Sequence, residues 1–143
     1  MGHRRRAREL AMQALFYLDT IPDIPAEEAL EIFRRNFPLT DGASSDFFLE
    51  ITGGVIRNME EIDPLIERFS TKWKLYRMSA VDRNVMRIAV YEMLFCDDIP
   101  AQVSINEAID IGKKYGSSDS GAFINGILDG INKTLSENGN SAS

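Results

Sequence analysis

The amino-acid sequence predicts an all-α fold of about seven helices. Apolar residues recur with helical spacing along nearly the whole chain, and helix-capping residues and prolines stand at the ends of these stretches. No stretch shows strand-like alternation bounded by hairpin turns. At 143 residues, with 44% hydrophobic and 27% charged residues, the chain suits a single globular domain. We find no internal repeat and no linker that would separate two domains.

The first half of the chain predicts four helices. The first begins among the N-terminal arginines, and its apolar face comprises Ala7, Leu10, Ala11, Ala14, Leu15 and Leu18. The second lies between Pro25 and Pro38, and its expected buried face comprises Ala26, Ala29, Leu30, Phe33 and Phe37. The third should run from about 45 to 59 and bury Phe48, Ile51, Val55 and Met59.

Asp63 and Pro64 have the order of an N-cap followed by a proline at the first helical position. They predict a fourth helix that continues through Phe69.

The second half carries clearer helix boundaries. Ser79 and Asp82 form a variant capping box that opens a helix to about Phe95, and this helix is apolar nearly all round, which predicts a central position. Ser104 and Glu107 form a full capping box for the next helix, and Gly116 stands where a C-terminal cap belongs. The last helix is expected to end near 135, which gives a domain over 1–135 and a disordered tail over 136–143.

Positive charge is concentrated at the start of the chain. Arg4, Arg5, Arg6 and Arg8 contribute +4 to a whole-chain formal net charge of −6, which leaves −10 on the rest. A second basic excess lies between Arg68 and Arg87. Two basic zones on an acidic protein predict a localised site for a polyanion.

The arginines do not resemble a secretory signal, because Glu9 and Gln13 interrupt the following apolar stretch. A mitochondrial transit peptide is also Arg-rich and amphipathic, but the same helix supplies an apolar stripe that the core needs. The single cysteine, Cys96, excludes an intramolecular disulfide and suits a reducing cytoplasm. No apolar run is long enough to span a bilayer.

The usual parts of a catalytic site are missing from the sequence. The only histidine is His3, at the chain terminus, so a Ser-His or Cys-His pair is not expected. One cysteine and one histidine do not make a zinc site of the usual composition. The stretch GKKYGSS lacks the earlier glycine of a phosphate-binding loop and follows a helix instead of a strand.

Polyanion recognition is the chemistry that remains, and a charged N-terminus that only faces solvent is the alternative. A helix N-terminus offers free N–H groups to phosphate, and guanidinium groups can hold phosphate with two hydrogen bonds. Tyr115 follows Lys113 and Lys114 at a helix end, where its ring can stack on a base or pack against Phe123 in the core. Trp73 and Tyr76 are interleaved with basic residues, although the spacing of Trp73 from Ile66 and Phe69 also predicts a core position.

Four blocks of sequence resemble the bacterial transcription antitermination factor NusB family. They are RRRARELAMQALF, VDRNVMRIAVYEM, INEAIDIGKKYG and SSDSGAFINGILDGI, in matching order and spacing. The segment from about 20 to 75 matches only in helical pattern. Gly112 departs from the family, which more often has alanine there, and Gly130 stands where lysine is frequent.

The resemblance implies two perpendicular three-helix bundles with an additional helix, and a cytoplasmic, non-enzymatic protein without a cofactor. It implies binding of single-stranded boxA RNA from ribosomal RNA transcripts as a heterodimer with NusE, a small-subunit ribosomal protein. That complex joins NusA, NusG and RNA polymerase, and some members form homodimers that cover the arginine-rich region. The implied RNA site comprises Arg4, Arg5, Arg6, Arg8, Lys113, Tyr115, Gly116 and Asp119, and the resemblance places Asp82 at the surface that faces NusE.

Two other functions remain open at this point. A NusB-like domain precedes the catalytic domain of some ribosomal RNA cytosine methyltransferases, but this chain lacks the glycine-rich cofactor loop and the further residues of such an enzyme. A helical oligomer that binds only proteins is the third class.

Overall fold

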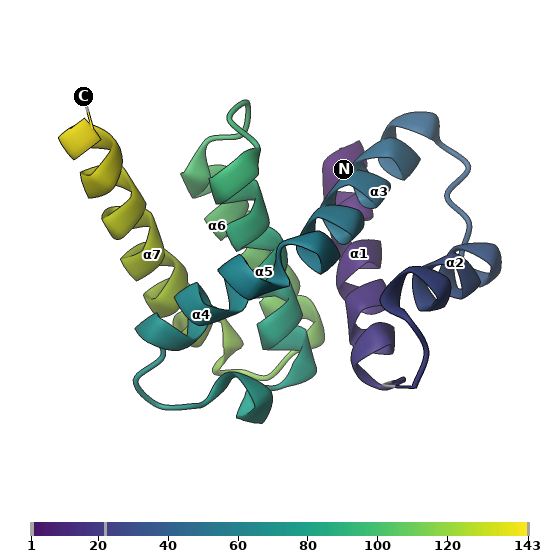
Figure 1. Ribbon diagram of the computed structural model, residues 1–143, viewed down its shortest axis with the longest axis horizontal. Helices are drawn as coiled ribbons and strands as arrows, with labels where there is room; N and C mark the ends of the chain where they lie inside the picture. Colours follow the sequence, from purple (N-terminus) through teal and green to yellow (C-terminus); the bar gives the residue numbers. More distant parts are fainter. Residues whose placement is uncertain (1, 22, 143) are drawn as a thin grey trace.

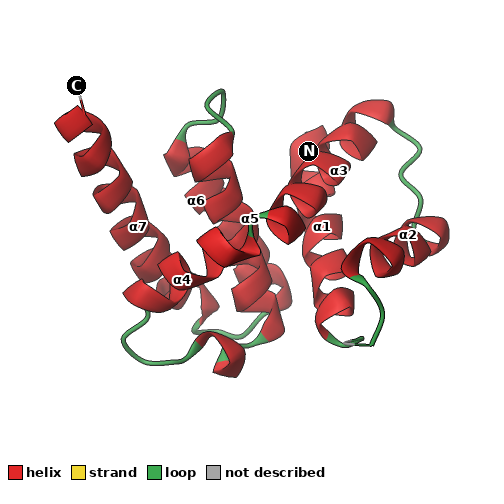
Figure 2. Cartoon of the chain, viewed as in Figure 1, coloured by secondary structure: helices red, strands yellow, loops and turns green. Residues whose placement is uncertain are grey.

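The computed structural model describes residues 2–21 and 23–142, with side chains described as far as Asn138. The described residues form seven α-helices and one short 3-10 helix, with no strand among them (Figure 1 and Figure 2). The all-α prediction is confirmed. The elements are α1 (His3–Asp19), α2 (Ala26–Asn36), α3 (Gly42–Arg57), α4 (Met59–Phe69), η1 (Leu75–Arg77), α5 (Ala80–Phe95), α6 (Ala101–Tyr115) and α7 (Ser120–Ala142).

Helix α5 lies at the centre of the fold. It packs against α6 and α7 on one side and against α1 and α3 on the other, whereas α2 contacts α1 and α4 contacts α5 and α7. Figure 1 shows α1–α3 on one side of the molecule and α4, α6 and α7 on the other, with α5 between the two groups. Residues 84–92 of α5 are all buried, as the apolar sequence of this helix predicts.

Local capping signals are confirmed at two helix ends. The Ser79 hydroxyl accepts a hydrogen bond from the backbone N–H of Asp82 at 3.1 Å, which caps α5. The Gly116 N–H donates to the carbonyl of Gly112 at 2.8 Å and closes α6.

Three predicted helix starts differ from the structure. Helix α3 begins at Gly42 instead of about 45 because Asp41 is its N-cap, and the Asp41 carboxylate accepts from the Ser44 N–H at 3.3 Å. Helix α4 begins at Met59 and contains Pro64, while the Asp63 carboxylate binds Arg87 instead of capping a helix. Helix α6 begins at Ala101, so Ser104 lies inside it and is not a cap.

Two aromatic residues are exposed: Phe37, which was expected in the core, and Trp73, for which the core was one of two predicted positions. Phe37 is 54% exposed because α2 ends at Asn36, one residue before it. Trp73 is 44% exposed because α4 ends at Phe69, so the helical spacing from Ile66 does not continue to it.

Helix α7 extends beyond its expected end at 135. Residues 136–142, predicted as a disordered tail, continue the helix, and residue 143 lies outside the described residues. Ser136, Glu137 and Asn138 are exposed, so the polar character of these three residues reflects solvent exposure and not a loss of helix.

Candidate nucleic-acid interface

The four N-terminal arginines do not all point in the same direction from the first turns of α1. Successive residues of an α-helix are turned by about 100°, so Arg4, Arg5 and Arg6 point in three directions, whereas Arg8 shares the face of Arg4 and lies over the same Phe47 ring. Their environments differ, because Arg4 and Arg6 are exposed, Arg5 is half-buried and Arg8, one turn further along the helix, is buried. The arginine run therefore divides into outward and inward side chains.

Arg8 forms a buried ion pair with Glu92 of α5. Its Nε and Nη2 donate to the two carboxylate oxygens of Glu92, each at 2.7 Å, and both side chains are almost fully buried. The Ser104 hydroxyl donates to the same carboxylate at 2.7 Å, and Arg8 Nη1 donates to Glu107 at 3.1 Å. The guanidinium of Arg8 is thus occupied inside the protein, which differs from the expectation of four arginines open to phosphate.

Arg5 extends this network toward the surface. Its Nε donates to Glu107 at 2.8 Å, and its Nη2 donates to Glu107 and to Asp110 of α6. The hydrogen bond from Arg5 holds the pKa of Glu107 below its ordinary value of 4.5. The N-terminus of α1 is therefore fixed against α6 by ion pairs.

Arg4 and Arg6 are the arginines that face solvent. Arg4 donates to Asp98 at 3.0 Å and lies 5.0 Å from the centre of the Phe47 ring. Asp98 is itself exposed, and a pair between exposed groups is weak in water. The Arg6 backbone N–H donates to the Gly2 carbonyl, but its guanidinium has no hydrogen bond or ion pair with any residue in the described part of the chain. These two side chains are available to an external anion.

The corner between α6 and α7 carries the other expected RNA-binding residues. Lys113, Tyr115, Gly116 and Asp119 are all exposed there. Tyr115 is 37% exposed, and the Lys114 ammonium lies 5.2 Å from the centre of its ring. No contact with Phe123 appears among the aromatic pairs of the described residues. The ring is thus a half-open aromatic surface beside two lysines.

Gly116 and Asp82 meet beneath this corner. A Cβ at Gly116 would lie 2.4 Å from Ser120 Oγ, 2.6 Å from the Gly112 carbonyl and 3.2 Å from Asp82 Oδ1, so only glycine fits without movement. Asp82 is buried, and its Oδ1 accepts no hydrogen bond from the described residues. The structure therefore places Asp82 under the α6–α7 corner, with little of its side chain at the surface.

Four ion pairs hold α1 beside α6. Besides the Arg5–Glu107 and Arg8–Glu107 pairs, Arg5 contacts Asp110 at 2.9 Å, and Lys114 contacts Glu9 at 3.0 Å. Arg6 and Glu9 line the same cleft, and Glu9 pairs with Lys114 beside Tyr115, so Arg6 lies on the side of the aromatic corner. Arg4 instead pairs with Asp98, which precedes the start of α6, whereas Tyr115 is the last residue of that helix. Asp82 and Arg8 lie beneath the surface.

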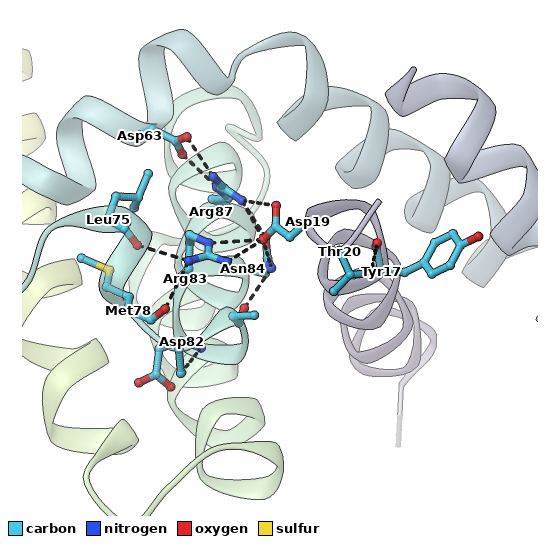
Figure 3. A network of polar contacts seen from close by, with 12 residues as sticks. Tyr17, Asp19, Thr20, Asp63, Leu75, Met78, Asp82, Arg83, Asn84 and Arg87 are labelled. Atoms are coloured by element: carbon cyan, nitrogen blue, oxygen red, sulfur yellow. Dashed lines mark hydrogen bonds and ion pairs between the residues drawn. The ribbon is translucent and has the colours of Figure 1, made fainter. Parts of the chain in front are cut away.

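The second basic zone is largely an internal network. Arg87 binds Asp63 through two contacts of 2.9 Å, and Arg83 and Arg87 both contact Asp19 at the end of α1 (Figure 3). Arg83 also donates to the carbonyls of Leu75 and Met78, which fixes the approach to α5. These two arginines stabilise the junction of α1, α4 and α5. The exposed members of the zone are Arg68, Lys72, Lys74 and Arg77.

The acidic partners of the arginines are not evident from the sequence. Nothing in the sequence near Glu92 and Glu107 indicates that they bind arginines, since their partners are far away in the sequence. One signal does exist, because Arg8 lies in helical register with the buried Met12 and Leu15. An arginine on a buried stripe requires a buried partner, and Glu92 stands on the buried face of α5.

Other chemistry is limited in the described residues. They contain no group of three or more histidine, cysteine or acidic residues that could hold a metal ion. Burial raises the pKa of the Cys96 thiol to about 12, which keeps it protonated and unreactive. Among the helices as described, none combines the length and the apolar character needed to cross a membrane.

Comparison with known proteins places this architecture in a family. The family model described as "NusB family" matches residues 5–133. A transcription antitermination protein NusB of Desulfatibacillum aliphaticivorans is 62% identical over 135 residues, which are 94% of this chain and 93% of that protein. One from Desulforapulum autotrophicum is 52% identical over 132 residues, 92% of each chain.

Solved structures agree in fold. The structure of T. maritima NusB superposes with a TM-score of 0.81 at 44% identity and covers 91% of this chain and 90% of its own. A structure of the antitermination factors NusB and NusE in complex with double-stranded RNA gives a TM-score of 0.83 at 25% identity, over 94% and 98% of the two chains. The matched family model spans nearly the whole chain and the identity to curated relatives is high: this chain belongs to the NusB family.

Proposed function

We propose that this chain is a transcription antitermination factor that binds single-stranded boxA RNA of ribosomal RNA transcripts together with NusE. In this role it works without catalysis or a cofactor, as an adaptor in a complex with NusA, NusG and RNA polymerase in the cytoplasm. The relatives named above are antitermination proteins, and one similar structure contains NusB and NusE with double-stranded RNA. These similarities support the proposal.

One observation within the chain carries the RNA assignment. The exposed Arg4 and Arg6 and the half-open ring of Tyr115 lie on helices that Arg5–Asp110 and Lys114–Glu9 hold together. Guanidinium groups bind phosphate, and an exposed ring offers a stacking face to an unpaired base. Single strands are therefore the form of RNA that this surface suits best.

The proposed RNA surface comprises Arg4, Arg5, Arg6, Lys113, Tyr115, Gly116 and Asp119. Arg5 contributes through the guanidinium nitrogen that Glu107 and Asp110 leave free. Arg8 supports the surface from below, through its pair with Glu92. Asp82 lies beneath the α6–α7 corner, close to Gly116, and contributes to NusE binding from there.

Filter binding tests this proposal. A radiolabelled single-stranded boxA RNA should be retained by the chain, and more strongly when NusE is added. A shuffled RNA of the same composition serves as the control. Retention of neither RNA, with or without NusE, would favour the purely protein-binding class instead, and equal retention of both would contradict boxA specificity.

A further inference from the structure

A groove lies between α1 and the segment that connects α2 to α3. It consists of two adjoining clefts of about 230 and about 280 Å³, which share Leu10, Phe37, Pro38 and Leu39 as lining residues. Together the clefts reach the size of a small-molecule site. Of its lining residues, only Arg6 and Glu9 have roles assigned above.

Phe37 is a preformed aromatic surface within the groove. Its ring stacks on the buried Phe33 with the ring centres 4.8 Å apart, and yet 54% of the side chain is exposed. Pro38 restricts the backbone of Phe37, so the ring is held in place before any ligand arrives. An exposed aromatic ring with one side supported by the core presents its other side for stacking.

The groove is flanked by arginines. Arg34 and Arg35 line the cleft of about 230 Å³, and Arg6 lines the other. Arg34 pairs with Glu31 at 3.0 Å, whereas Arg6 and Arg35 are exposed without an ion pair in the described part of the chain. On a chain with a net charge of −6, this placement favours an anionic ligand.

The groove also continues the RNA surface proposed above. Arg6 and Glu9 line its second cleft, and Glu9 is the residue that binds Lys114 beside Tyr115. A path therefore leads from Tyr115 across α1 to Phe37, with an aromatic ring at each end and Arg6 between them. Alternating rings and cations are the pattern that binds a single strand.

We infer that this groove is a second nucleotide-binding subsite for the same single-stranded RNA. A base of the strand stacks on Phe37, and the adjacent phosphates contact Arg35 and Arg6. This inference rests on the proposed function, because it extends the RNA path beyond the corner of Tyr115. It assigns binding roles to Phe37 and Arg35.

Two RNAs of different length separate the subsite from the main site. One is a short single-stranded boxA RNA, and the other carries about four further nucleotides at each end, within the site sizes of single-strand binding surfaces. The parent chain should bind the longer RNA more tightly. Phe37→Ala should weaken binding of the longer RNA between about fivefold and about 150-fold, the value of one stacked base, and leave the short RNA nearly unaffected.

Matched controls exist on the same molecule. Phe95 is 45% exposed, stands at the end of α5 and contacts Tyr91 in a tilted ring pair with centres 5.3 Å apart, so Phe95→Ala removes a comparably exposed ring away from the groove. Arg35→Gln should lower the salt slope for the longer RNA by about 0.7 in magnitude. Arg57→Gln, which removes an exposed arginine from the last turn of α3, should leave that slope unchanged.

The possible results distinguish the inference from the function on which it rests. Equal affinity of the parent for both RNAs, or equal behaviour of Phe37→Ala and Phe95→Ala, would overturn the subsite and leave the main site intact. A parent that binds neither RNA would refute the proposed function and the subsite with it. If Phe37→Ala changes the sedimentation coefficient but not RNA affinity, the groove joins two copies of this chain and the RNA assignment is wrong.

Discussion

Arg8 and Glu92 form a two-bond ion pair that joins α1 to α5 in the interior of the protein. Both Glu92 oxygens are occupied, and the Ser104 hydroxyl adds a third donor. Burial lowers the pKa of Arg8, but the hydrogen bonds and charge of Glu92 outweigh this effect, so the pKa of Arg8 is raised. The arginine stays charged, and the pair stabilises the packing of α1 on α5 beneath the proposed RNA surface.

Removal of Arg8 should destabilise the fold. Arg8→Ala leaves Glu92 buried without its partner, which costs about 3–5 kcal/mol of unfolding free energy. Arg6→Ala is the control on the same helix, and as a surface change it should cost less than about 0.5 kcal/mol. Urea denaturation measures both values. Equal losses of unfolding free energy in the two variants would show that the Arg8–Glu92 pair does not stabilise the fold.

Stability should depend on pH through Glu107. Because the pKa of Glu107 is lowered in the folded state, its contribution is complete above its ordinary value of 4.5 and is lost as pH falls through the lower folded value. Glu107→Gln should therefore reduce stability at neutral pH and flatten the loss of stability on acidification below pH 4.5. Urea titrations over a pH series test this. Parallel pH profiles for parent and variant would contradict it.

Tyr115 should act in binding and not in folding. Tyr115→Phe keeps the ring and should preserve RNA affinity, whereas Tyr115→Ala should cost about 1–3 kcal/mol of binding free energy. With 37% of the side chain exposed, little stability should be lost. RNA titration and thermal melting measure the two effects. A stability loss of about 3–5 kcal/mol in the alanine variant would instead identify a core residue.

Asp82 should affect partner binding through its charge. Asp82→Asn preserves size and should cost at most about 1 kcal/mol of stability, the value of a charge at a helix N-terminus. The affinity for NusE should fall about tenfold, which is about 1.4 kcal/mol. Asp97→Asn, at an exposed position after α5, is the control. Calorimetric titration with NusE measures the affinity of each variant. Proportional losses of stability and affinity would show that Asp82 has only a structural role.

The sequence predicted features that depend on neighbouring residues. The buried character of α5 and its Ser79 cap follow from local composition and spacing, and both are confirmed. The predictions that failed depend on distant partners. Glu107 has the spacing of a capping residue, but its partner is Arg5, 102 positions away. Asp63 likewise has the sequence of a cap and binds Arg87 instead.

Helix ends account for the other differences. The apolar spacing that assigned Phe37 to the core holds only while the helix continues, and α2 ends one residue earlier. The charge run at the N-terminus predicted the location of a polyanion surface. It did not predict which arginines face solvent, because that depends on the acidic groups that α5 and α6 present to α1.

The salt dependence of RNA binding tests the central claim most directly. If Arg4 and Arg6 each contact a phosphate, the variant with both replaced by alanine should bind boxA RNA more weakly. Its slope of log affinity against log salt should be smaller in magnitude by about 1.4, from about 0.7 per phosphate on a single strand. Circular dichroism should show an unchanged helix content. A slope equal to that of the parent would contradict the assignment of this surface to RNA.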